Sequence, residues 1–115
     1  MTQAIVITGA GVLTSNGMGR EAFWDAIEHG RSGVRRIEGF EVEDLPCQIG
    51  GQLNEFNPED FMRRSVIRNW QRYVHQAIAA SKLAVADAEL SAAGYDGDRV
   101  AVAIGTSIGN PDELF

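Results

Sequence analysis

The chain has 115 residues, 44% of them hydrophobic and 23% charged, which are values typical of one globular domain. Its formal net charge of −6 argues against general nucleic-acid binding, and its sequence has no apolar run of about 18 residues, as a membrane span would need. The one cysteine, Cys47, cannot form an internal disulfide, so we expect a reducing, cytoplasmic location.

Residues 4–7 form a short apolar run that is followed by Gly9 and Gly11. Such a run predicts a strand that is buried on both faces, as in parallel sheets. The glycines also suggest a dinucleotide-binding turn, but the G-x-G-x-x-G spacing requires glycine where this chain has Thr14. We therefore interpret them as a tight turn after a buried strand, and keep nicotinamide binding as an alternative.

The next segments predict one helix and one doubtful strand. A helix is expected over residues 21–28, and Gly30 should end it because glycine accepts a left-handed backbone. Residues 34–45 show no clear period and are predicted to be loop. Residues 48–53 are consistent with a short strand that Gly50 and Gly51 interrupt.

Two helix starts follow. Asn57 and Pro58 predict an N-cap and a first helical residue. The longest helix is expected from about residue 67 or 69 to residue 88, because apolar and small residues recur at helical spacing. The predicted stripe consists of Trp70, Val74, Ala77, Ile78, Ser81, Ala84, Val85 and Ala88. Its many alanines make this helix thin enough to pack in an inner layer.

Residues 99–104 predict a second strand with apolar residues on both faces. Two such strands need neighbouring strands and covering helices, which a chain of this length would not supply. We therefore expect residues 1–115 to be an incomplete portion of a larger α/β domain, with no internal domain boundary, and keep a complete small domain as the alternative. The glycine-rich turn at 105–109 follows the second strand, where α/β folds tend to form ligand pockets.

The sign of the charge reverses between Asp60 and Asp87, where no acidic residue occurs. The basic residues in this interval are Arg63, Arg64, Arg68, Arg72 and Lys82. If the segment is one continuous helix, Arg64, Arg68 and Arg72 share a face. That face could be merely solvated, or it could dock a negatively charged partner by electrostatic steering.

A thiol–imidazole site from Cys47, His29 and His75 is not favoured, because nothing in their spacing brings them together. His75 lies off the predicted apolar stripe and is expected to be solvated. No cluster of histidines, cysteines or carboxylates has the spacing of metal ligands, so no metal site is predicted.

Several motifs, in their order along the chain, resemble the opening of elongating β-ketoacyl carrier-protein synthases. The similar segments are residues 6–12, 23–24, 30–34, 56–60, 64–68, 86–88 and 100–109. Each motif is weak alone, but together they cover nearly the whole chain. The resemblance implies the N-terminal part of a thiolase-like fold, which is layered α/β/α/β/α when complete and forms a dimer.

The same resemblance implies a decarboxylative Claisen condensation in fatty-acid or polyketide extension. An acyl group moves from a carrier protein to a cysteine, and malonyl-carrier protein then loses carbon dioxide and attacks the thioester. Substrates arrive on the phosphopantetheine of the carrier protein, and no other cofactor is implied. The family's cysteine and histidines follow position 115, so we assign no catalytic residue to this segment and expect no activity from it alone.

The resemblance does assign two kinds of binding residue. Ile108, between Gly105 and Gly109, is similar to the apolar residue that gates the acyl pocket. Arg64 and Arg68 are similar to residues that meet an acidic acyl carrier protein, and helix geometry extends this set to Arg63 and Arg72. Where the family often has Met-Asp, this chain has Trp70 and Gln71.

Two alternatives to a catalytic synthase remain open from the sequence. One is a non-catalytic chain-length factor, which pairs with a ketosynthase in a heterodimer in place of a homodimer. The other is a nicotinamide-dependent oxidoreductase, which the glycine turn near the N-terminus suggests.

Overall fold

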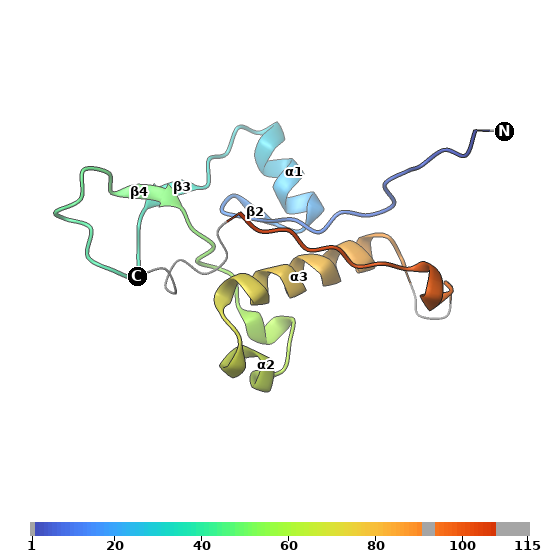
Figure 1. Ribbon diagram of the computed structural model, residues 1–115. Coiled ribbons are helices and arrows are strands. Elements are labelled where there is room, and N and C mark those ends of the chain that lie inside the picture. The colour runs from blue at the N-terminus through green and yellow to red at the C-terminus, as the bar shows by residue number, and fades with distance from the viewer. Residues whose placement is uncertain (1, 91–93, 108–115) are drawn as a thin grey trace.

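The computed structural model describes residues 2–90 and 94–107. Two short hairpins and the helix α1 lie on one side of the long helix α3, and the helix α2 lies on its other side (Figure 1). Among the described residues, none of the helices combines the length and apolar character needed to cross a membrane.

The helix α1 spans Arg20–Glu28, close to the predicted bounds. His29 is its C-cap, and Gly30 follows with a φ of 62°, the left-handed conformation that glycine accepts readily. The Gly30 N–H donates to Ile27 O at 3.0 Å, and the Arg31 N–H donates to Ala26 O at 2.7 Å. These two bonds form the Schellman arrangement that ends many helices, so the predicted helix end is confirmed.

Each small sheet is an antiparallel pair. The strand β1 (Leu13–Thr14) pairs with β2 (Gly17–Met18), directly before α1. The strand β3 (Val34–Arg36) pairs with β4 (Ile49–Gly51). A strand within residues 48–53 is thus confirmed, but Gly50 and Gly51 belong to it and do not interrupt it. The prediction of loop at residues 34–36 is wrong. A three-residue strand has too few positions to show an alternation in the sequence.

The long helix predicted from residue 67 or 69 is two helices. The helix α2 spans Arg64–Asn69, and α3 spans Arg72–Asp87. Trp70 and Gln71 between them have extended backbones, with ψ of 154° and 164°. The two helices therefore do not share one apolar stripe. The 3-10 turn η1 (Pro58–Asp60) precedes α2, and the Asn57 side chain caps it as predicted by accepting a bond from the Glu59 N–H.

The buried face of α3 also differs from the predicted stripe. Its buried residues are His75 and Ala79, and His75 is only 6% exposed. The expectation that His75 is solvated is therefore wrong. Because the extended backbone at Trp70 interrupts the helix, the face that α3 turns toward the core cannot be extrapolated from Trp70.

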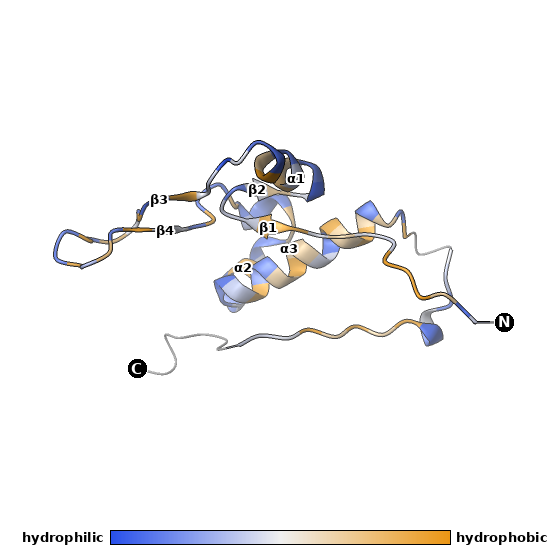
Figure 2. Cartoon of the chain, turned by 90° about the horizontal axis from the view of Figure 1, so that it is seen from above, coloured by the Kyte–Doolittle hydropathy of each residue, from blue (hydrophilic) through white to orange (hydrophobic). Residues whose placement is uncertain are grey.

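The two predicted buried strands are extended but unpaired among the described residues. Ile5 is 99% exposed and Val102 is 83% exposed, and Figure 2 shows apolar residues along both segments. The short turn η2 (Gly97–Arg99) occupies the expected start of the second strand. The predictions that both segments are paired and buried are therefore wrong for this structure. A strand needs a neighbouring strand to complete its backbone hydrogen bonds, and the described residues supply none here.

The direction of these two segments is nevertheless that of an α/β unit. Residues 4–12 and residues 100–107 run in the same sense, and α3 between them runs in the opposite sense (Figure 1 and Figure 2). A strand, a returning helix and a parallel strand follow each other in this way in α/β folds. The α/β class predicted from the sequence therefore agrees with the arrangement.

Gly9 and Gly11 pack directly on the backbone of α3. A Cβ atom on Gly9 would lie 2.6 Å from Ala84 O, and one on Gly11 would lie 1.8 Å from Ala80 O. Only a residue without a side chain fits at such distances. The alanines of α3 and the two glycines are thus the two sides of one close contact.

Asp87 fixes this contact at the C-terminal end of α3. Its Oδ2 accepts a bond from the Ala10 N–H at 2.9 Å, and its Oδ1 lies 3.2 Å from Arg20 Nη2 at the start of α1. The Asp87 side chain is mostly buried. One carboxylate therefore joins the glycine segment, α1 and α3.

We expect Gly11→Ala to lower the free energy of unfolding by about 2 kcal/mol, within the range of overpacked positions. The control is Gly97→Ala, since a Cβ atom there meets nothing within 4 Å. It should change stability by less than about 0.5 kcal/mol. Urea unfolding of the full-length protein measures both, and an equally small effect at Gly11 would contradict the close contact.

Candidate functional site

The basic residues predicted as a docking face lie at the N-cap of α2, on α2 and on α3, and the structure divides them into two groups. Arg64 and Arg72 are held by neighbours, whereas Arg63 and Arg68 are exposed at the two ends of α2. Because the helix is broken at Trp70, the prediction that Arg64, Arg68 and Arg72 share one continuous helix face is wrong.

Arg64 forms an ion pair within its own surface. Its Nε lies 3.1 Å from Glu59 Oε1, and its Nη2 donates to Glu59 Oε2 at 3.4 Å. Glu59 precedes the acid-free interval, so the sequence interval alone did not show this pairing. The carboxylate offsets much of the charge that Arg64 would present to a partner.

Arg72 at the start of α3 has a structural contact. Its Nη2 donates to Leu53 O at 2.7 Å, and its guanidinium carbon lies 5.3 Å from the centre of the buried Phe56 ring. This is the geometry of a cation–π interaction. Lys82 is engaged in a similar way, because its Nζ donates to Phe61 O.

The side chains of Arg63 and Arg68 have no such contacts among the described residues and remain available to a partner. Both side chains are exposed, and within the part of the chain that the structure describes neither has an ion-pair partner. Arg63 is the N-cap residue of α2, and Arg68 lies in its last turn, where a cation also suits the helix dipole. Arg63 and Arg68 are therefore the two arginines of this surface whose side chains make no ion pair or side-chain hydrogen bond within the described residues, whereas Arg72 keeps its charge but is held by Leu53 O and the Phe56 ring.

Only part of the turn at residues 105–109, which was predicted to line the acyl pocket, lies within the described residues. Ile108 and Gly109 fall outside the described residues. Gly105 is exposed, and a Cβ atom there would meet nothing within 4 Å. Its role in substrate binding therefore stays a prediction.

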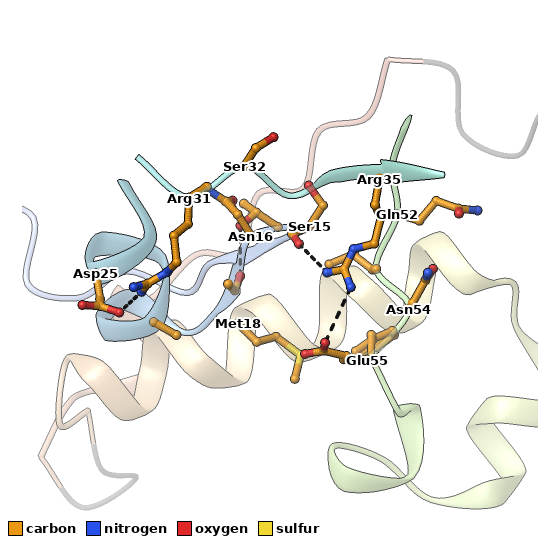
Figure 3. A pocket seen from close by; sticks show the side chains of 15 residues that line it. Ser15, Asn16, Met18, Asp25, Arg31, Ser32, Arg35, Gln52, Asn54 and Glu55 are labelled. Carbon is orange, nitrogen blue, oxygen red and sulfur yellow. Dashed lines mark hydrogen bonds and ion pairs between the residues drawn. The ribbon is translucent and has the colours of Figure 1, made fainter. Parts of the chain in front are cut away.

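A pocket of about 520 Å³ lies between the β1–β2 hairpin, the start of β3 and residues 52–56 (Figure 3). Arg31 pairs with Asp25 at one end, and Arg35 at the other donates to Ser15 O at 3.3 Å and lies 4.0 Å from Glu55. The lining is mainly polar, and both guanidinium groups already have acceptors. Sequence reasoning missed this pocket because it depends on segments that are distant along the chain.

Close contacts hold one wall of this pocket in place. A Cβ atom on Gly33 would lie 2.4 Å from the carbonyl carbon of Ser15, and one on Gly51 would lie 2.9 Å from Ser15 Oγ. Thr14 Oγ1 donates to Asn16 Oδ1 at 2.8 Å in the same turn. These glycines therefore position the β1–β2 turn against the second hairpin.

The thiol and the imidazoles do not form a site. Cys47 is exposed before β4, and its Sγ lies 3.4 Å from Ile49 O. His29 at the end of α1 lies 3.1 Å from Asp25 Oδ1. His75 is buried within α3, and its Nε2 has no hydrogen-bond partner among the described atoms. Across residues 2–90 and 94–107, no group of three potential ligands could hold a metal ion.

Among the described residues, Glu43 on the loop before β4 has a clearly shifted pKa. The pKa of Glu43 lies below its usual value because its own backbone N–H, the Arg36 side chain and the Val42 N–H stabilise the carboxylate. Arg36 Nη2 lies 2.8 Å from Glu43 Oε1. The pair connects β3 to the exposed loop before β4, so we assign it to local structure.

The glycine turn has no free amide for a phosphate at Ala10. The Ala10 N–H is bonded to Asp87, and α3 fills the space beside Gly9 and Gly11. These contacts account for both glycines through packing. They remove the observation that suggested a nicotinamide oxidoreductase, and the comparisons below give that alternative no support.

Comparisons with known proteins identify relatives along nearly the whole chain. Residues 2–114 match the family model described as "Beta-ketoacyl synthase, N-terminal domain". A "3-oxoacyl-[acyl-carrier-protein] synthase 2" of Synechocystis sp. is 33% identical over 91% of this chain and 25% of its own length. A "Putative polyketide beta-ketoacyl synthase 2" of Streptomyces halstedii is 37% identical over 79% of this chain and 22% of its own.

A solved structure is similar in its backbone as well. The structure described as "The ishigamide ketosynthase/chain length factor" superposes with a TM-score of 0.69 at 32% identity. The match covers 75% of this chain and 21% of that one. The chain thus spans about a quarter of the length of the curated relatives it matches.

Arg72→Ala should lower the free energy of unfolding by about 1 kcal/mol, because it removes a cation–π contact and a charged hydrogen bond. Arg68→Ala is the matched control and should change stability by less than about 0.5 kcal/mol. Chemical denaturation of the full-length protein compares the two variants. Equal stabilities would show that the contacts of Arg72 with Phe56 and Leu53 are not structural.

Proposed function

The chain belongs to the β-ketoacyl synthase family, and we propose that it is the N-terminal portion of a β-ketoacyl carrier-protein synthase. The observation that carries the proposal is the family match over residues 2–114. The chain corresponds to about a quarter of its relatives, so the activity proposed here is that of a longer protein.

The proposed reaction is a decarboxylative Claisen condensation. An acyl group passes from a carrier-protein thioester to an enzyme cysteine, and the carrier thiol leaves. Malonyl-carrier protein then loses carbon dioxide, and the electron pair of the broken bond attacks the acyl carbonyl carbon. The enzyme thiolate leaves as a β-ketoacyl-carrier protein forms. We propose no catalytic residue within this chain, and no cofactor beyond the carrier's phosphopantetheine.

In this mechanism the chain supplies two binding functions. The turn from Gly105 to Gly109 would present Ile108 to the acyl chain. The surface of α2 would meet an acidic acyl carrier protein. Arg63 and Arg68 are the best candidates on that surface, because Arg64 and Arg72 already have partners within the chain.

We propose cytoplasmic location and a dimer, in line with the dimeric thiolase-like fold. Whether the second subunit is a copy of the same protein or a different one depends on the role of this protein. A chain-length factor is the second candidate, since the similar solved structure is a ketosynthase/chain length factor.

The function is tested by mixing the full-length protein with an acyl-carrier protein and malonyl-carrier protein. A synthase should form an acyl-enzyme and a β-ketoacyl product that mass spectrometry detects. A chain-length factor should give product only together with a ketosynthase partner and should not itself be acylated. Absence of product under both conditions would contradict the proposed family function for this protein.

We expect Arg63→Glu with Arg68→Glu to weaken carrier-protein binding by about tenfold or more at low salt. The loss should shrink above about 0.1 M salt, where the Debye length is about 10 Å. The control is Arg99→Glu, a charge reversal on η2 outside α2. Isothermal titration calorimetry measures the double variant and the control, and equal affinities would reject α2 as the docking surface.

Replacing Ile108 with phenylalanine should shorten the longest acyl chain that the enzyme accepts, because the larger ring fills space in the proposed acyl pocket. Gly105→Ala adds one methyl group on the same turn and should have a smaller effect. Product chain length is measured by mass spectrometry. A product profile identical to that of the parent enzyme would remove Ile108 from the pocket.

A further inference from the structure

We draw no further inference here: the strongest candidate, the polar pocket between the β1–β2 hairpin, the start of β3 and residues 52–56, carries nothing, because Arg31 and Arg35 already have acceptors within the chain and nothing in the structure shows what fills or covers it.

Discussion

The structure depends on the contact between the glycine segment and the alanine-rich face of α3. Gly9 and Gly11 bring one backbone against another at distances that exclude any side chain. Asp87 closes the contact by accepting the Ala10 N–H and pairing with Arg20. Because α1 begins at Arg20, this carboxylate also sets where the first helix leaves the core. The role of Gly9 and Gly11 is therefore to let their segment pack closely on α3, and this contact sets the α/β arrangement.

The proposed functional surface is a consequence of how α3 begins. If α2 and α3 were continuous, Trp70 would lie on the stripe of α3 and Arg72 would line up with Arg68. The break lets Arg72 reach Leu53 and Phe56, which ties α3 to the segment before η1. It also leaves Trp70 and Arg68 exposed together. The change in backbone direction at Trp70 thus separates Arg72, which has structural contacts, from Arg68, which stays exposed.

The sequence predicted the parts that depend on local signals. Gly30 ends α1, and Asn57 caps η1, because each acts on its own neighbours. The break at Trp70 was missed because helical spacing continues through it, and the partners of Arg64 and Arg72 were missed because they come from earlier segments. The strands at residues 4–7 and 99–104 were recognised by composition, but their pairing needs neighbours that the described residues do not supply. The family resemblance drew on the order of motifs and is confirmed by the comparisons.

The central claim is that Asp87 holds the glycine segment on α3. Hydrogen–deuterium exchange of the peptide covering residues 8–12, in the full-length protein and its Asp87→Ala variant, tests it most directly. The Ala10 N–H should exchange slowly in the parent protein and much faster in the variant, while peptides from β3 and β4 stay unchanged. Equal exchange of residues 8–12 in the two proteins would contradict the account.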